Sequence, residues 1–279
     1  MDALVTTDWL AGELGASDLR VLDATYYLPS DKGDAAAEYE GAHIPRAVFM
    51  DLAALADPTT DLPSMLPPAE LFASRMAALG LCDDSRVVLY DRSPYTTAAR
   101  AWFTLRSFGM HQVALLDGGF ARWRAEGRAV ANGNEHPDHG SVTAQADSKG
   151  VRTLDQMKAN LASGEEQVLD ARSAARFTGE EPDPRPGTEP GHIPNSRNLH
   201  YKQLFHPDGT WKTGDDLRTA FDRAGIDLAK PLVTTCGSGI TASVLAFGAH
   251  LLGHDAAVYD GSWSEWGADH STPKATGTA

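Results

Sequence analysis

One of the two cysteines of the chain lies in a segment whose residue types favour a reactive thiolate. The segment reads VTTCGSGITAS, from Val233 to Ser243: an apolar run leads to Cys236, and glycines and hydroxyl residues follow without any charge. Glycine lets a backbone curl tightly, and inward-facing amides at a helix N-terminus stabilise an anion such as a thiolate. The sequence therefore predicts a nucleophile at Cys236 that is held by backbone dipoles, with no cationic side chain inside the loop.

A buried structural cysteine is the alternative interpretation of Cys236, but glycines at the end of a strand are hard to explain by packing. Cys82 suits the structural role better. It lies in LGLCDDS, beside two acidic residues that disfavour a thiolate. We therefore expect a catalytic role for Cys236 and a structural role for Cys82.

The elements around Cys236 would place it at a binding edge. Val233 belongs to an apolar run typical of a buried strand, and from Thr241 the apolar residues recur at helical spacing. Residues 236–240 then form a strand-to-helix loop, at the edge where parallel α/β sheets bind ligands. We expect the substrate to contact the loop residues Gly237, Gly239, Ile240 and Thr241.

The chain contains the same series of motifs twice. The matching segments are RVLDATYYLP and QVLDARSAARF, EGAHIPRAVFMDL and EPGHIPNSRNLHY, RVVLYDRSPYTTAA and PLVTTCGSGITAS, and VALLDGGFARW and AAVYDGSWSEW. Repeats this long indicate duplication of a whole domain rather than a solenoid. Asp91 stands where Cys236 stands in the second half, and its loop, DRSPYTTAA, has a proline and no glycine. We expect the first half to be catalytically inactive.

Each half alternates apolar runs with helical patterns, which predicts an α/β fold with a mostly parallel sheet flanked by helices on both faces. The expected strands include residues 21–22, 87–90, 113–116, 168–169, 231–235 and 257–259, and the expected helices include 70–79, 97–108, 216–224 and 241–252. We predict an inactive domain at 1–135, a linker at 136–150 and a catalytic domain at 151–279.

The paired HIP motifs, the DGG and DGSWSEW segments and the CGSGITA loop resemble the rhodanese superfamily in its tandem two-domain form. Within it, the uncharged loop is similar to that of 3-mercaptopyruvate sulfurtransferases, whereas thiosulfate-specific rhodaneses typically carry basic residues after the cysteine. The resemblance implies an enzyme that moves sulfur from 3-mercaptopyruvate to a persulfide on Cys236, releases pyruvate, and passes the sulfur to cyanide, a small thiol or thioredoxin.

The resemblance also places the two arginines that bind the substrate at Arg176 and Arg185. Guanidinium groups suit a carboxylate, because they bind it through paired hydrogen bonds. Arg172 lies nearby and competes for this role, although it could instead face solvent or pair with an acid.

A proton relay of Ser238, His43 and an acid is a further implication of the resemblance. Asp34 is the preferred acid, and Asp31, Glu38 and Glu40 stay open. On the alternative interpretation, His43 and His192 simply order the HIP turn that both halves share. If His43 is catalytic, the active site lies between the two halves.

The composition of the chain excludes some classes of binding partner. The net charge is −14, which argues against nucleic acid. No apolar run is long enough for a membrane helix, no secretory signal is visible at the N-terminus, and we expect a cytoplasmic protein without metal or cofactor. Thiosulfate:cyanide sulfurtransferase, a cysteine phosphatase and a non-catalytic sulfur carrier are the rival functions. The phosphatase is disfavoured because Ala242 and Ser243 stand where it would need an arginine.

Overall fold

The computed structural model describes residues 1–278, which form two compact units. The first unit comprises Met1–Asp57, Leu66–Asp147 and Pro207–Trp211, and the second comprises Pro58–Met65, Ser148–His206 and the chain from Lys212 onward. Most of the expected linker therefore belongs to the first unit. The reason is backbone pairing, since the amide of Gly140 donates to Ala77 and the amide of Gln145 donates to Phe108.

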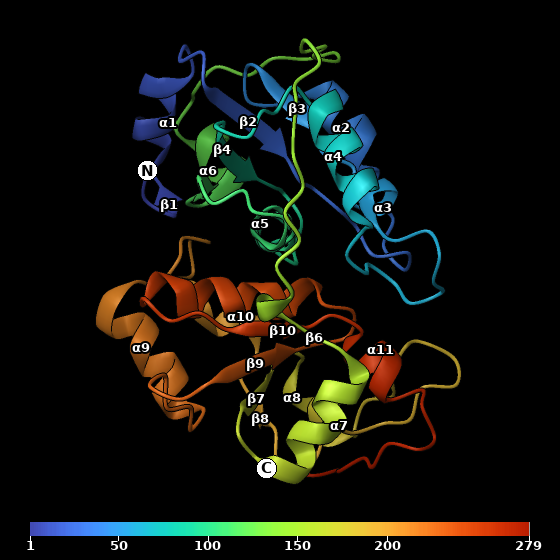
Figure 1. The fold of residues 1–279 in the computed structure, drawn as a ribbon. Coiled ribbons are helices and arrows are strands. Elements are labelled where there is room, and N and C mark those ends of the chain that lie inside the picture. Colours follow the sequence, from blue (N-terminus) through green and yellow to red (C-terminus); the bar gives the residue numbers. More distant parts are fainter. Residues whose placement is uncertain (279) are drawn as a thin grey trace. The chain divides into compact units, whose positions relative to one another are not determined.

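Helices and strands alternate through both units (Figure 1). The first unit contains β1 (Leu4–Val5), α1 (Thr7–Glu13), β2 (Leu19–Asp23), α2 (Ala35–Gly41), β3 (Ala47–Phe49), α3 (Leu52–Leu55), α4 (Ala69–Ala78), β4 (Arg86–Tyr90), α5 (Ala98–Ser107), β5 (Val113–Leu116) and α6 (Gly119–Ala125). The second unit contains η1 (Ser148–Gly150), β6 (Val151–Arg152), α7 (Leu154–Ser163), β7 (Gln167–Asp170), α8 (Ala174–Thr178), β8 (Arg197–Asn198), η2 (Tyr201–Leu204), α9 (Gly214–Arg223), β9 (Leu232–Thr235), α10 (Ile240–Leu251), β10 (Ala257–Tyr259) and α11 (Ser262–Trp266).

Each unit is built on one five-stranded parallel sheet, and the strand order is equivalent in the two. The orders are β1-β5-β4-β2-β3 and β6-β10-β9-β7-β8. In the second unit, α9 and α10 lie on one side of the sheet and α7 and α11 on the other (Figure 1). The predicted fold class is confirmed. The central strand is β4 in the first sheet and β9 in the second. Its carboxyl end therefore lies at the middle of the sheet edge where parallel α/β folds bind ligands.

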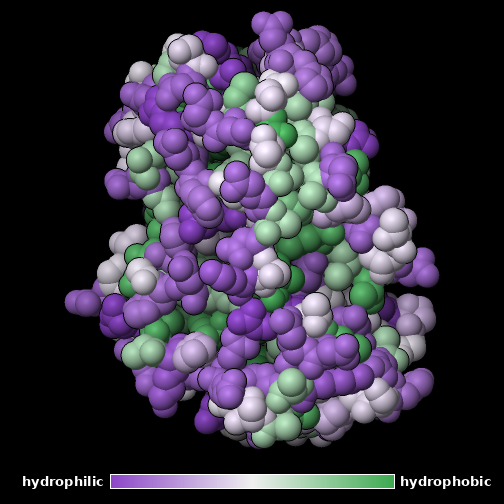
Figure 2. Space-filling model, in the orientation of Figure 1, coloured by the Kyte–Doolittle hydropathy of each residue, from purple (hydrophilic) through white to green (hydrophobic). Residues whose placement is uncertain are grey.

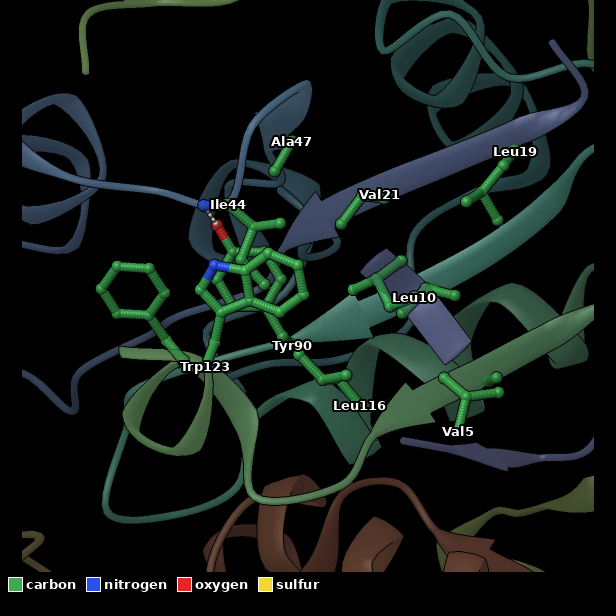
Figure 3. Close-up of a cluster of buried hydrophobic side chains, with 12 residues drawn as sticks. Val5, Leu10, Leu19, Val21, Ile44, Ala47, Tyr90, Leu116 and Trp123 are labelled. Atoms are coloured by element: carbon green, nitrogen blue, oxygen red, sulfur yellow. Dashed lines mark hydrogen bonds between the residues drawn. The ribbon is translucent and has the colours of Figure 1, made fainter. Parts of the chain in front are cut away.

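Apolar side chains that alternate with the pleat fill the space between sheet and helices. In the first unit they form the cluster in Figure 3, where Leu10, Tyr90 and Trp123 pack together and are at most 2% exposed. In the second unit, Tyr259, Trp263 and Trp266 occupy a corresponding cluster. Burial of each large side chain contributes about 1.5–3 kcal/mol. On the face drawn in Figure 2, hydrophilic side chains predominate.

The residue after each HIP motif adopts a left-handed backbone. Arg46 has φ 67° and Asn195 has φ 66°, and both residues are exposed. This conformation is strained for a residue with a Cβ, less so for asparagine. The turn is therefore the same in both units, although neither has glycine there.

Candidate active site

Cys236 lies directly after the central strand β9 and before helix α10, which begins at Ile240. The predicted strand–loop–helix arrangement around the cysteine is therefore present. Cys236 is a free thiol and 2% exposed. Gly239 has φ 78°, a left-handed conformation that lets the loop turn sharply into the helix.

A serine in the DGSWSEW segment fixes this loop through hydrogen bonds to its backbone. The Ser262 hydroxyl accepts hydrogen bonds from the amides of Cys236 (3.2 Å) and Gly239 (3.0 Å) and donates to the carbonyl of Tyr259 (2.8 Å). The amide and hydroxyl of Ser264 both donate to the carbonyl of Gly237. Neither serine has a sequence signal for this role, because only the tryptophans of the segment form a recognisable pattern.

The remaining amides of the loop are free to hold an anion. Two loop amides are engaged by Ser262, which the sequence did not indicate. No oxygen within residues 1–278 accepts a hydrogen bond from the main-chain N–H groups of Gly237, Ser238, Ile240, Thr241 and Ala242. Unpaired amides at a helix start form a concave binding site for negative charge. These amides lie in the loop that begins at Cys236 and in the first turn of α10.

Two guanidinium groups reach the same loop from the segment around α8. A Cβ atom placed on Gly237 would lie 3.3 Å from Nη1 of Arg185 and 3.5 Å from Nη2 of Arg176. The loop itself has no cation, as expected, yet the structure brings two cations against it from another segment. The absence of a side chain at Gly237 leaves room for them.

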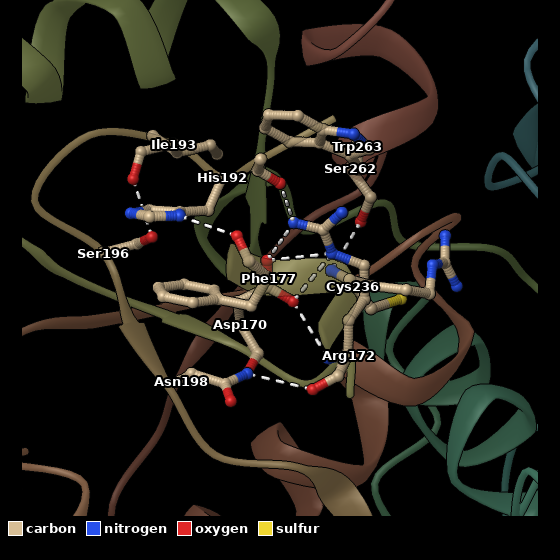
Figure 4. Close-up of polar contacts among 12 residues, drawn as sticks. Asp170, Arg172, Phe177, His192, Ile193, Ser196, Asn198, Cys236, Ser262 and Trp263 are labelled. Atoms are coloured by element: carbon tan, nitrogen blue, oxygen red, sulfur yellow. Dashed lines mark hydrogen bonds and ion pairs between the residues drawn. The ribbon is translucent and has the colours of Figure 1, made fainter. Parts of the chain in front are cut away.

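Arg172, the third arginine of this region, is committed to a buried ion pair. Its Nη2 donates to Asp170 (2.6 Å) and to the carbonyl of Gly191 (2.8 Å), and its guanidinium lies 4.5 Å from the ring of Trp263 (Figure 4). Arg172 is 4% exposed. Of the interpretations of Arg172, pairing with an acid is the one observed.

His43 and His192 occupy equivalent environments in the two units. Nδ1 of His43 bonds to the carbonyl of Tyr39 (2.9 Å), and Nδ1 of His192 bonds to that of Phe177 (2.8 Å). Each ring also stacks on that same aromatic residue, and burial lowers the pKa of His192. Both histidines therefore order the HIP turn, whatever else His43 does.

The predicted pairing of His43 with Asp34 is absent from the structure. The carboxylate of Asp34 caps helix α2 by accepting from the amide of Ala37 (3.0 Å). Nε2 of His43 faces Glu135 instead, at 3.9 Å. Asp34 and His43 belong to the first unit, whereas Cys236 and Ser238 belong to the second. Ser238 is 4% exposed, and its hydroxyl has no hydrogen-bond partner within residues 1–278.

The two units both match one known family. The model of the rhodanese-like domain matches residues 6–126 and again residues 153–269. The chain belongs to the rhodanese family. Its predicted resemblance and its two tandem domains are thereby confirmed.

Relatives within the family cover nearly the whole chain. Human 3-mercaptopyruvate sulfurtransferase is 42% identical over 95% of this chain and 91% of its own length. The mitochondrial thiosulfate/3-mercaptopyruvate sulfurtransferase 1 of Arabidopsis thaliana is 39% identical over 98% of this chain and 78% of its own length. Among solved structures, SseA of Escherichia coli, described as a 3-mercaptopyruvate sulfotransferase, aligns with TM-score 0.86 and 35% identity over 95% of this chain and all of its own.

The first rhodanese-like domain uses its loop amides for its own side chain. The Asp91 carboxylate accepts from the amides of Ser93 (3.0 Å) and Ala98 (2.7 Å). Burial raises the pKa of Asp91 to about 7, although the amide bond from Ala98 acts in the opposite direction. A carboxylate therefore occupies the anion site at the position that the cysteine holds in the second domain.

Metal binding and membrane insertion each depend on particular features of the structure. Within residues 1–278, no group of three or more His, Cys, Asp or Glu side chains is arranged to hold a metal ion. Over the same residues, every helix is too short or too polar to span a membrane.

Proposed function

We propose that this chain is a sulfurtransferase that takes sulfur from 3-mercaptopyruvate, carries it as a persulfide on Cys236 and passes it to an acceptor. One observation carries the proposal: the nucleophile, five unpaired amides and two guanidinium groups converge on one loop. Amides suit a sulfur anion, and guanidinium groups suit a carboxylate. 3-Mercaptopyruvate presents a sulfur and a carboxylate within one small molecule.

In the first half-reaction, the Cys236 thiolate attacks the thiol sulfur of the donor. A sulfur–sulfur bond forms, the carbon–sulfur bond breaks, and its electron pair leaves on the enolate of pyruvate. The thiol proton of the donor ends on the methyl carbon of pyruvate, so the step needs no oxidant or reductant. The product on the enzyme is a persulfide anion at the same amides. Covalent catalysis of this kind predicts ping-pong kinetics.

The proton must travel from the donor sulfur to the enolate carbon. Ser238 supports this role because it lies two residues after the nucleophile with an uncommitted hydroxyl. A hydroxyl can donate and accept at once. The participation of His43 and Asp34 in a relay stays a prediction. The buried position and carbonyl bond of His43 favour a role in the turn.

Cyanide, a small thiol or thioredoxin is the predicted acceptor, and the cytoplasm is the predicted location. Neither follows from the fold. The Arabidopsis relative is named as mitochondrial and as active on both donors, so thiosulfate is the second candidate donor. A cysteine phosphatase fits poorly, because the first turn of α10 has Ala242 and Ser243 where its arginine would stand.

Mass spectrometry of the intact protein tests the proposal. After mixing with 3-mercaptopyruvate, the wild type should gain the mass of one sulfur atom on the peptide containing Cys236, and adding cyanide should remove it. Cys236→Ser should gain none and should keep its circular dichroism spectrum. Cys82→Ser is the matched control and should still gain sulfur. Sulfur on Cys82, or none with either donor, contradicts the proposal.

A further inference from the structure

A buried acid lies between the two arginines beside the nucleophile loop. The side chain of Asp183 is 1% exposed. One oxygen accepts from Nη2 of Arg176, and the other accepts from the amide of Arg185 at 3.0 Å and from its Nη1 at 3.4 Å. The side chains of Arg176 and Arg185 are 22% and 30% exposed. A fixed carboxylate thus holds two partly open guanidinium groups in place.

This arrangement sets the charge of the clamp, by which we mean Arg176, Asp183 and Arg185. Two guanidinium charges and one carboxylate charge leave one net positive charge. Arg172 adds nothing further, because Asp170 neutralises it. Glu180 and Glu181, the other acids of the segment, are exposed, so solvent screens them.

The clamp keeps hydrogen-bond donors for a ligand. Nε of Arg176 has no partner within residues 1–278, and Nη2 of the same residue is the atom that Asp183 holds. Within residues 1–278, Asp183 is also the only acceptor of the Arg185 side chain. Nη1 of Arg185 and Nη2 of Arg176 are the guanidinium atoms that approach Gly237, so the clamp reaches the segment that follows the nucleophile.

We propose that Asp183 is a specificity-determining residue, which selects a sulfur donor with one negative charge over a donor with two. The inference rests on the proposed function and deepens it. 3-Mercaptopyruvate carries one carboxylate, which the single net charge of the clamp balances. Thiosulfate carries two negative charges, so the carboxylate of Asp183 repels it twice as strongly. Asp183 acts on the donor through this repulsion and through the positions of the two arginines.

Donor competition in variants of Asp183 tests the inference. In Asp183→Asn the clamp gains one positive charge at nearly constant shape. The ratio of kcat/KM for thiosulfate to kcat/KM for 3-mercaptopyruvate should rise about tenfold or more, mostly through a lower KM for thiosulfate. That KM should also rise more steeply with salt than in the wild type. Asp183→Glu should keep the wild-type ratio, and so should Glu180→Gln, which removes an exposed acid from the same segment.

A second variant keeps the test decisive if Asp183→Asn does not fold. Arg185→Gln lowers the clamp to zero net charge and should move the ratio the opposite way, with thiosulfate losing more than 3-mercaptopyruvate. Equal losses for both donors in Asp183→Asn, or an unchanged ratio in Arg185→Gln, overturn the inference and leave sulfur transfer intact. Wild-type protein that accepts sulfur from neither donor overturns the proposed function itself.

Discussion

Replacing Asp91 by asparagine should change how the stability of the first domain depends on pH. In the folded protein, burial raises the pKa of Asp91 from its ordinary value of 3.8 to about 7. Between these values the folded state binds a proton that the unfolded state has released. Stability therefore falls as pH rises through this range, and the contribution is fully lost above the folded pKa.

The size of the effect follows from the shift. A difference of about 3 pKa units corresponds to roughly 4 kcal/mol, and partial exposure of Asp91 lowers the expected value to roughly 2–4 kcal/mol. Asparagine does not titrate, so it removes this pH dependence. It also loses one of the two amide bonds from Ser93 and Ala98, at a cost of about 1–3 kcal/mol that is the same at every pH.

Urea unfolding of both proteins at pH 4, 6 and 8 measures the difference. Asp91→Asn should be the less stable protein at pH 4 and should gain roughly 2–4 kcal/mol relative to wild type by pH 8. Asp18→Asn is the control in the same domain. Arg86 lowers the pKa of Asp18, so its titration is complete at lower pH and its difference from wild type should be constant from pH 6 to 8. A constant difference for Asp91→Asn from pH 4 to 8 would show that its carboxylate is already ionised and held by the two amides.

Other predictions concern the clamp, the proton and the HIP turns. Arg176→Ala and Arg185→Ala should each raise KM for 3-mercaptopyruvate about 10- to 100-fold, because each removes charged hydrogen bonds. An equal rise of KM for the acceptor in steady-state kinetics would contradict the clamp. Ser238→Ala should slow single-turnover sulfur transfer from 3-mercaptopyruvate about 100-fold. Transfer from thiosulfate requires no proton movement, so its rate should not change. Equal slowing with both donors would mean that Ser238 has another role. Arg46→Gly should raise the free energy of unfolding by about 1 kcal/mol, and Asn195→Gly by less; a loss of stability in thermal melts of Arg46→Gly would show that φ 67° is not strained.

The central elements could be predicted from the sequence because each one carries its own signal. β4, β5 and β10 are mainly apolar, β9 is buried along its whole length, and α5 and α10 repeat apolar residues at helical spacing. The edge strands β1, β6 and β8 have two residues each. Segments so short have no periodicity to detect, and only the neighbouring strand determines them.

The residues of the candidate site also differ in whether the local sequence indicates them. Cys236 and its glycines have a local pattern, so the sequence was sufficient to indicate a strand-to-helix loop. Ser262 acts through a contact with a loop 26 residues earlier in the chain. Asp183 contacts arginines nearby in the chain, but neither residue stands in a pattern that indicates its role. The prediction of Asp34 for the relay rests on the family resemblance and not on a local pattern. In the structure its carboxylate caps α2, a contact that an acid at a helix start commonly makes.

The two domains differ in where the cation beside a buried carboxylate comes from. Asp23 and Asp170 are buried at the ends of equivalent strands, and a buried carboxylate requires a cation. In the second domain Arg172 provides it from the β7 end. In the first domain Nη2 of Arg92, in the residue after Asp91, bonds to Asp23 (3.1 Å) and to the carbonyl of Ala42 (2.7 Å).

The aromatic partner is equivalent as well. The guanidinium of Arg92 lies 4.1 Å from the ring of Phe120, and that of Arg172 lies 4.5 Å from the ring of Trp263. The same ion pair is thus made by an arginine inside the loop in one domain and outside it in the other. Because the cation comes from outside the loop, Gly237 stands at the position of Arg92, and its missing side chain leaves room beside Cys236 for Arg176 and Arg185, the proposed substrate clamp.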